Sequence, residues 1–310
     1  MHMSEYLSIT ASNLWDNSDT VTNTTQSLPS YGTYDATQLQ GHLVVPNDDP
    51  THDALVNFAH QLADASSAAI LPHFRSQLSV DNKAQEGRFD PVTVADRAAE
   101  TAIRQLIEST HPEHGILGEE HGSTASQGPY RWVVDPIDGT RAFIIGLPTW
   151  GTLIGLEINE RPTIGLMNQP YTGDRFWSDG NTSSYRSTDG TTRRIKSRTG
   201  VRLENAQMAS TDPTMFRDDH DRATFDTLRS RATGCRFGTD CYAYALLAAG
   251  FIDLVVEAGL QPYDIVALIP IIENAGGVIT TWDGGDPRHG GRILAAGSAA
   301  LHSEALELIA

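Results

Sequence analysis

The chain has 310 residues, 39% of them hydrophobic, with 27 Gly and 15 Pro, a composition that excludes collagen-like and wholly disordered proteins. Asp and Glu outnumber Lys and Arg by 39 to 22, giving a formal net charge of −17. This charge argues against non-specific binding to nucleic acids or anionic membranes, because both would be repelled. No apolar run is long enough for a transmembrane helix and the N-terminus lacks the pattern of a secretory signal, so we expect a cytoplasmic protein.

Residues 1–50 differ from the rest of the chain, since they contain no Lys or Arg, six acidic residues and a middle rich in Ser, Thr and Asn. Such a segment buries too little apolar surface to offset its ordering entropy, so we expect a disordered N-terminal extension. The alternative is an arm whose aromatic residues pack on this or a neighbouring subunit. Two cysteines, Cys235 and Cys241, are too few for a disulfide framework, and we expect reduced thiols.

From Asp53 onward the pattern is that of a folded protein, in which apolar residues at helical spacing predict helices over 52–73 and 91–109. Short β-like runs follow at 115–118, 132–135, 151–158, 163–167 and 175–178. The polar stretch 181–200 is expected to be a loop or an edge hairpin. The last third alternates between helices (239–249, 263–275, 299–309) and strands (252–256, 277–282, 292–296). This alternation predicts an α/β protein with helices covering sheets, which we divide into an N-terminal part (51–195) and a C-terminal part (196–310).

The sharpest motif is Trp132-Val-Val-Asp135-Pro-Ile-Asp138-Gly-Thr140, in which a hydrophobic strand leads into a turn. Pro136 fixes φ and Gly139 permits a sharp reversal, so the two carboxylates can converge together with the carbonyl of Ile137. Hard oxygen ligands of this kind suit Mg²⁺ or Mn²⁺. Taken alone, the segment is equally well explained as a turn, because Asp-Pro and Asp-Gly are common turn dipeptides.

Three further acidic segments have equally ordinary explanations when each is taken alone. Gly118-Glu119-Glu120 follows a strand-like run and could be a solvated turn. Asp96, in Asp90-Pro-Val-Thr93-Val-Ala-Asp96, could be a first-turn carboxylate favoured by the helix dipole. Asp264, seven residues after Glu257, could be an N-cap of the apolar helix that follows.

Together and in this order, the four segments resemble the inositol monophosphatase superfamily of metal-dependent sugar and alcohol phosphatases. The matching patterns are PVT-x-x-D, GEE, WxxDPIDGT and a late Asp that opens a helix, and the resemblance covers about residues 53–310. Arg141 after Thr140 and the run Gly238-Thr-Asp240-Cys-Tyr-Ala are similar to the histidinol-phosphatase branch, although Thr239 stands where that branch has a second Gly. The resemblance implies a five-layered αβαβα sandwich and a homodimer.

The resemblance also implies the roles of individual residues. One Mg²⁺ would be held by Glu119, Asp135 and the Ile137 carbonyl, and a second by Asp135, Asp138 and Asp264; a third, weaker ion near Glu119 and Asp96 is compatible with the pattern, and Mn²⁺ could substitute. The implied catalytic residues are Asp96, Thr140 and Glu119, with Asp96 and Thr140 orienting the attacking water. The implied substrate-binding residues are Gly139, Thr140, Arg141, Asp240 and Glu257.

The resulting hypothesis is a Mg²⁺-dependent phosphatase that hydrolyses L-histidinol phosphate by attack of an activated water. The alternatives are a sister enzyme acting on inositol 1-phosphate or another small phosphomonoester, and a catalytically silent regulatory homologue. The complete acidic set argues against the silent homologue. His111 and His114 have metal-ligand spacing, but Pro112 breaks a helix there, so we do not expect a metal site at these residues.

Overall fold

The computed structural model describes residues 50–77, 80–83 and 91–309. The predicted disorder of residues 1–50 therefore falls, except for Pro50, outside the described residues. Among the residues that are described, no helix combines the length and the apolar character needed to cross a membrane.

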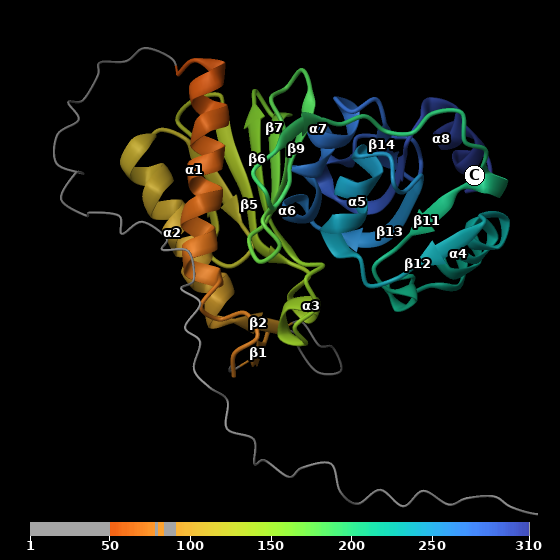
Figure 1. The fold of residues 1–310 in the computed structure, drawn as a ribbon, viewed down its shortest axis with the longest axis horizontal. Helices are drawn as coiled ribbons and strands as arrows, with labels where there is room; N and C mark the ends of the chain where they lie inside the picture. The colour runs from red at the N-terminus through yellow and green to blue at the C-terminus, as the bar shows by residue number, and fades with distance from the viewer. Residues whose placement is uncertain (1–49, 78–79, 84–90, 310) are drawn as a thin grey trace, which may run out of the picture. The chain divides into compact units, whose positions relative to one another are not determined.

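The first large sheet has eight strands in the order β10-β9-β8-β7-β6-β5-β3-β4 (Figure 1). All neighbouring pairs are antiparallel except β3 and β5, which run parallel. The strands are β3 (Gly115–Gly118), β4 (Gly122–Thr124), β5 (Tyr130–Asp138), β6 (Gly151–Ile158), β7 (Arg161–Gln169), β8 (Asp174–Ser178), β9 (Ser183–Arg186) and β10 (Thr192–Arg194). A separate two-stranded sheet pairs β1 (Val80–Asn82) with β2 (Pro91–Thr93).

The second large sheet has five strands in the order β12-β11-β13-β15-β14. Its strands are β11 (Gln207–Ala209), β12 (Gly234–Arg236), β13 (Leu254–Leu260), β14 (Val278–Thr281) and β15 (Gly291–Ala296). Strand β11 runs parallel to β12 and β13, whereas β15 is antiparallel to both of its neighbours.

Helices cover both sheets and fill the space between them (Figure 1). The outer face of the first sheet carries α1 (His52–Ile70) and α2 (Val94–Thr110). Between the sheets lie α5 (Asp240–Ala248), α6 (Pro262–Ile265) and α7 (Leu268–Glu273). The second sheet is covered on its outer side by α4 (Asp219–Arg231) and α8 (Ala299–Leu306). The remaining helices are α3 (Thr140–Ile144), η2 (Leu203–Asn205), η3 (Pro213–Met215) and η4 (Pro287–His289). This order of layers confirms the predicted αβαβα sandwich.

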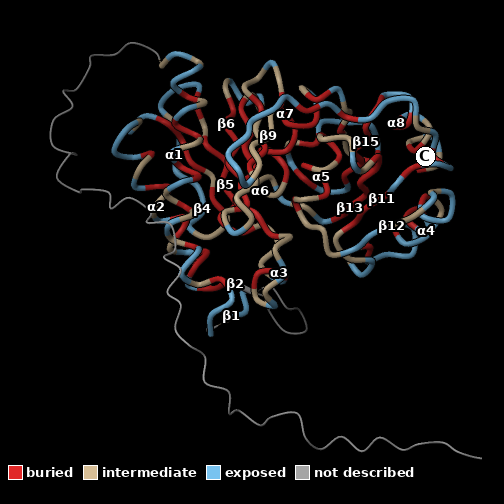
Figure 2. The backbone as a smooth tube through the Cα atoms, in the orientation of Figure 1, coloured by how far each residue is buried: buried red, intermediate tan, exposed pale blue. Residues whose placement is uncertain are grey.

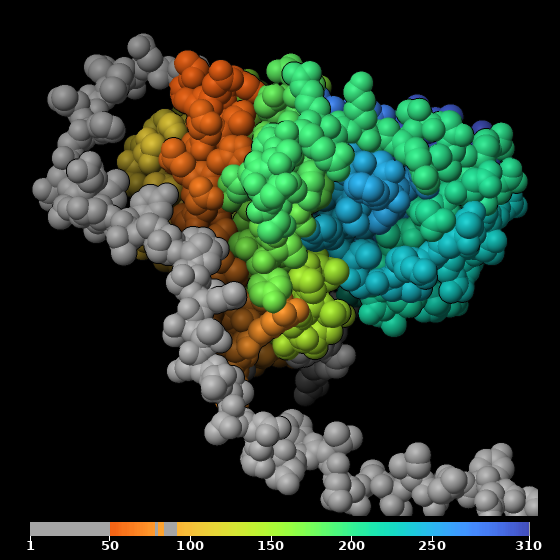
Figure 3. Space-filling model, viewed as in Figure 1, coloured from red at the N-terminus to blue at the C-terminus, as the bar shows by residue number. Residues whose placement is uncertain are grey.

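Apolar side chains fill each interface between layers, and the buried segments of the tube follow the faces where helices meet strands (Figure 2). Leu55, Phe58 and Leu62 of α1 pack with Trp132 of β5, as the helical spacing predicts. The middle layer packs α5 and α7 against both sheets through Met167, Tyr244, Leu247, Ile271, Val255 and Ile293. In the space-filling view no gap separates the orange α1 from the green segments beside it (Figure 3).

Most predicted elements are present, and two strands, over 115–118 and 151–158, have the predicted bounds. The polar stretch 181–200 contains the hairpin of β9 and β10 at the edge of the first sheet. Helix α2 begins at Val94 instead of residue 91, because Thr93 is its N-cap and forms a capping box with Asp96.

The structure corrects one predicted helix and adds one that was not predicted. The helix predicted over 263–275 is divided into α6 and α7, because Pro270 has no N–H to donate to the carbonyl of Val266. Helix α4 was not predicted, since it is strongly polar and buries a single narrow face, formed by Asp221, Thr224, Phe225 and Leu228.

Candidate active site

The site begins at the C-terminal end of β5, where a register shift between Asp135 and Asp138 interrupts the pairing with β6. A bulge of this kind bends the strand and redirects its side chains. Asp135 Oδ1 accepts a hydrogen bond from the Ile137 N–H at 3.0 Å, which holds the carboxylate against the turn. The sharp turn predicted from the sequence is therefore a bulged strand end that brings both carboxylates into one cluster.

Gly139 ends this turn in the left-handed region, with φ 83° and ψ 38°. A β-carbon at this position would lie 2.9 Å from Cγ of Asp240, so the site requires glycine for space as well as for conformation. Helix α3 begins at the next residue, Thr140.

Glu119 reaches the cluster because β3 runs parallel to β5 and the two strands end at the same edge of the sheet. Gly118, the last residue of β3, pairs with Val134 of β5. The residues that follow these two, Glu119 and Asp135, are therefore neighbours. Besides burial, the negative charge of Glu119 is one of the neighbouring charges that raise the pKa of Asp135. The turn after Glu119 is fixed by the buried Glu100, whose carboxylate accepts from the N–H of Glu120 at 2.6 Å.

Asp264 is supplied by the middle layer, since α6 packs against β5 and β6. Its Oδ2 accepts from the Gln261 N–H at 2.7 Å in a capping box. The N-cap of α6 is Gln261 and Asp264 is the third residue of the helix, so the interpretation of Asp264 as an N-cap is wrong. The cap leaves the other oxygen of Asp264 for the cluster. One ligand atom each from Asp135, Asp138 and Asp264 lie within 4.8 Å of one another.

Asp96 and Thr140 meet at the side of this cluster. Asp96 is fully buried, and its Oδ2 accepts from the Thr93 N–H at 2.9 Å and from the Thr93 hydroxyl at 2.6 Å. The Thr140 hydroxyl lies 3.5 Å from Asp96 Oδ1 and 3.1 Å from the Ile137 carbonyl oxygen, both of which are acceptors. The single hydroxyl proton of Thr140 therefore points toward these two acceptors, and the lone pairs of the hydroxyl oxygen remain free to accept from a further donor.

Burial raises the pKa of each carboxylate in the cluster. The pKa of Asp135 and of Asp138 is raised well above the usual range, first by burial and then by neighbouring acids. Burial raises the pKa of Asp264 to about 7. Lys83 contacts Glu119 at 2.8 Å, but among the described residues no Lys or Arg forms an ion pair with the three aspartates. Asp135 is buried and Asp138 and Asp264 are half-buried, and this set of oxygen donors, without a cationic partner in the described part of the chain, fits a hard divalent cation.

A cavity of about 310 Å³ opens beside the cluster, and four residues predicted to bind substrate line it: Gly139, Thr140, Arg141 and Asp240. Thr211, Met215 and Arg217 also line this cavity and were not predicted, because they lie in a loop without a motif. Burial raises the pKa of Asp240 to about 6.

Glu257 lies deeper, in a smaller cavity of about 80 Å³ that it shares with Asp138 and Asp264. It is buried, and its carboxylate accepts from the Thr211 N–H at 2.8 Å and from the Tyr244 hydroxyl at 2.9 Å. Burial raises the pKa of Glu257 to about 7.

His111, Glu113 and His114 do come together, with the two imidazole rings stacked at 4.4 Å. However, the indole N–H of Trp132 donates to His114 Nδ1 at 3.1 Å. A neutral imidazole that accepts at Nδ1 carries its proton at Nε2, which then cannot bind a metal. The hydrogen bond from Trp132 therefore argues against a metal site at these residues.

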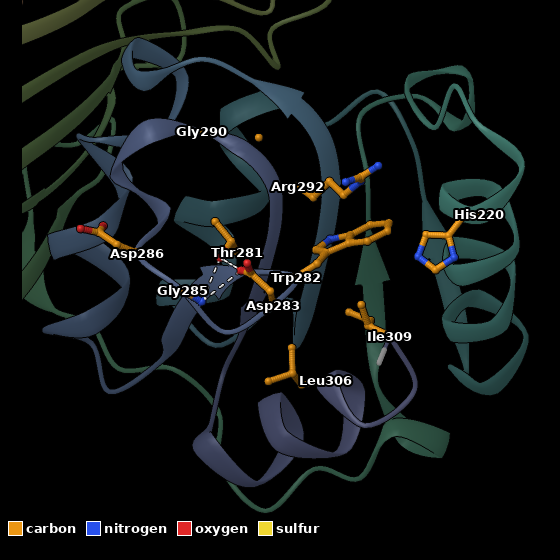
Figure 4. Close-up of a pocket in the computed structure, with 11 residues that line it drawn as sticks. His220, Thr281, Trp282, Asp283, Gly285, Asp286, Gly290, Arg292, Leu306 and Ile309 are labelled. Carbon is orange, nitrogen blue, oxygen red and sulfur yellow. Dashed lines mark hydrogen bonds between the residues drawn. The ribbon is translucent and has the colours of Figure 1, made fainter.

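A larger pocket of about 770 Å³ lies elsewhere, between the ends of β14 and β15 and the helices α4 and α8 (Figure 4). Trp282, Leu306 and Ile309 give it an apolar wall. Arg292 also lines this pocket, and its guanidinium pairs with Asp221 at 2.7 Å and with Asp218 at 3.1 Å. Asp283 and Asp286 also line this pocket, but among the described residues they are not part of a group of three metal-ligating side chains, so the pocket lacks the donor set of the candidate active site.

The chain is similar to known phosphatases in sequence and in structure. The sequence model of the inositol monophosphatase family matches residues 52–310. The chain is 38% identical to the chloroplastic bifunctional phosphatase IMPL2 of Arabidopsis thaliana, over 85% of this chain and 79% of that protein. It is 32% identical to the histidinol-phosphatase of Mycobacterium tuberculosis, over 83% and 97% of the two chains. The solved structure of an inositol monophosphatase from Zymomonas mobilis matches with a TM-score of 0.73 and 38% identity, over 84% and 99%.

Proposed function

The chain belongs to the inositol monophosphatase family of metal-dependent phosphatases, and from this premise we propose that it hydrolyses L-histidinol phosphate to L-histidinol and inorganic phosphate. The observation that carries the choice of substrate is a pair of carboxylates, Asp240 and Glu257, in the cavities beside the acidic cluster. The amino group of histidinol phosphate is cationic at neutral pH and would be attracted by them. The similarity to a histidinol-phosphatase supports the same choice.

Two Mg²⁺ ions would be held by the acidic cluster. Glu119, Asp135 and the Ile137 carbonyl are the proposed ligands of the first, and Asp135, Asp138 and Asp264 of the second. A third, weaker site near Glu119 and Asp96, and substitution by Mn²⁺, belong to the same proposal. When bound, such ions neutralise the charge of a phosphate and lower the pKa of a water molecule.

Thr140 and Asp96 would orient the attacking water. Thr93 fixes the Asp96 carboxylate through two hydrogen bonds, and that carboxylate and the Ile137 carbonyl keep the Thr140 proton pointing inward. The hydroxyl oxygen can then accept a hydrogen bond from the water. As the water gives up that proton to Thr140, the hydroxyl would pass its own proton to the Asp96 carboxylate, and the lone pair of the water oxygen would be directed at phosphorus. The backbone N–H groups of Gly139 and Thr140 are proposed to donate to the phosphate oxygens.

Arg141, Asp240 and Glu257 are proposed to bind the rest of the substrate. Arg141 and Asp240 line the larger cavity, which has room for the leaving alcohol. Glu257 already accepts hydrogen bonds from Thr211 and Tyr244, which fix its orientation while a lone pair remains for the substrate.

A second substrate, inositol 1-phosphate, is favoured by the similarity to the inositol monophosphatase of Zymomonas mobilis. A phosphate-release assay with Mg²⁺ distinguishes the two, using L-histidinol phosphate, inositol 1-phosphate, fructose 1,6-bisphosphate and 3′-phosphoadenosine 5′-phosphate. We expect the highest kcat/KM with L-histidinol phosphate and none with a chelator present. A preference for inositol 1-phosphate would overturn the choice of substrate. A lack of release from every compound would favour the silent homologue.

The remaining parts of the proposal concern the assembly and its location. We propose a homodimer, as the family resemblance implies, and a cytoplasmic location, as expected from the sequence. Light scattering coupled to gel filtration tests the dimer through its molar mass.

A further inference from the structure

The first turn of α5 holds one of the proposed metal ligands in place. The Cys241 N–H donates to Asp138 Oδ2 at 2.7 Å, and the preceding residue, Asp240, lines the substrate cavity. Asp240 has φ 44°, in the left-handed region of backbone conformation. Residues other than glycine seldom adopt this region, and they do so where the surrounding structure stabilises it. The turn therefore needs an anchor.

That anchor lies on the first large sheet. Tyr242, the next residue of α5, donates its hydroxyl to Oδ2 of Asp174 on β8. The same carboxylate accepts from the Thr172 hydroxyl at 3.0 Å and from the Tyr185 hydroxyl at 2.6 Å. Asp174 is the first residue of β8 and pairs with Gln169 of β7, and the rest of β8 is paired on both sides, so this carboxylate attaches the start of α5 to the sheet.

We propose that Asp174 and Tyr242 are positioning residues for the metal centre. By tying α5 to β8, they keep the Cys241 N–H on the carboxylate of Asp138 and hold Asp240 at the cavity. No hydrogen bond joins either residue to the acidic cluster, so the effect passes through the backbone of α5. The inference rests on the proposed function, because it takes Asp138 to be a metal ligand.

Tyr185 offers a matched control for Tyr242. Both phenols donate to the same carboxylate, and both rings pack on Phe176, with centroids 4.6 Å away for Tyr185 and 6.0 Å for Tyr242. Replacement by Phe removes one hydroxyl and keeps this packing in either case. Only Tyr242 is part of the helix that contacts Asp138, since Tyr185 lies on β9.

The test is isothermal titration of the full chain with Mn²⁺, for the wild type, Tyr242→Phe and Tyr185→Phe, with circular dichroism to verify folding. We expect Tyr242→Phe to weaken Mn²⁺ binding about tenfold, as is usual when a group that orients a ligand is lost. Tyr185→Phe should leave the affinity within about twofold of the wild type. Asp174→Asn, which loses one acceptor, should behave like Tyr242→Phe.

Each contrary result has its own meaning. Equal affinity in all variants, or an equal loss in Tyr185→Phe and Tyr242→Phe, would overturn the positioning role and leave the metal centre intact. Wild-type protein that binds no Mn²⁺ would overturn the proposed metal centre and this inference with it.

Discussion

Asp135 has the most demanding position in the acidic cluster, because it is the proposed ligand of two ions and is almost fully buried. Asp135→Asn keeps the volume but removes a charge and one oxygen donor, so we expect phosphate release to fall below about a tenth of wild type. Asp219→Asn is the control, since the Asp219 side chain is 99% exposed and pairs with Arg222 on its own helix. Turnover above that limit in Asp135→Asn, measured with saturating Mg²⁺, would contradict the assignment.

The hydroxyl of Thr140 can be tested without changing the size of the side chain. Thr140→Val should lower kcat by about a hundredfold and leave KM nearly unchanged, because a proton acceptor for the water is lost while binding groups remain. Thr140→Ser retains the hydroxyl and should keep most of the activity. If Val and Ser reduce kcat equally, the methyl group matters more than the hydroxyl, and another residue must orient the water.

Glu257 should determine specificity more than rate. A charge-assisted hydrogen bond to the amino group of histidinol phosphate contributes about 1.5–3 kcal/mol, which corresponds to roughly ten- to hundredfold in kcat/KM. Glu257→Gln should lose this factor on histidinol phosphate and little on p-nitrophenyl phosphate. The burial that raises the pKa of Glu257 to about 7 makes the difference largest above that pH, where the carboxylate is charged. Equal losses on both substrates would indicate that Glu257 only supports Thr211 and Tyr244.

The turn between β5 and α3 can be tested through the glycine at its end, Gly139. Gly139→Ala would combine an unfavourable φ of 83° with a β-carbon 2.9 Å from Cγ of Asp240. Gly190→Ala provides the control, since its φ is 82° but nothing lies within 4 Å of the added carbon. We expect Gly190→Ala to cost roughly 1 kcal/mol of unfolding free energy and no activity, and Gly139→Ala to cost more and lower turnover. If urea unfolding gives the same loss of unfolding free energy for Gly139→Ala and Gly190→Ala, the turn adjusts to the added carbon without disturbing Asp240.

Local signals explain which elements could be predicted from the sequence. The capping boxes of Thr93 with Asp96 and of Gln261 with Asp264 join residues three positions apart, and the strand over 151–158 is a mainly apolar run. Both kinds of feature are visible in the sequence. Helix α4 was missed because Phe225 and Leu228 are its only large buried apolar residues. The contact between Tyr242 and Asp174 joins residues 68 positions apart and leaves no periodic pattern.

The order of layers could be predicted, but the way in which distant segments complete the site could not. Asp135 and Asp138 come from the first sheet and Asp264 from the middle layer, and the pattern of acids alone does not fix their distances. Only the family resemblance implied, from the sequence, that these three aspartates share one metal site. By contrast, Thr211 and Cys241 carry no motif of their own, since they act through backbone N–H groups that any residue could supply.

The stability of the metal-free protein should depend on pH in a direction set by the acidic cluster. Burial raises the pKa of Asp264 and Glu257 to about 7 and that of Asp240 to about 6, from ordinary values of 3.8, 4.5 and 3.8. The folded state therefore binds these protons more tightly than the unfolded state. Their contribution to the unfolding free energy is complete below about pH 4 and is lost as the pH rises through about 7.

Divalent cations should reverse this loss, because they compensate the charges that burial penalises and bind only the folded state. We therefore expect the increase in melting temperature on replacing a chelator by excess Mg²⁺ to be small near pH 5 and to grow steadily towards about pH 8. Asp264→Asn should flatten this dependence, since it removes one proposed ligand and its titration, whereas Asp219→Asn, on the exposed face of α4, should not. An increase that is the same at every pH would place the Mg²⁺ effect outside the buried carboxylates, on the acidic surface of the molecule.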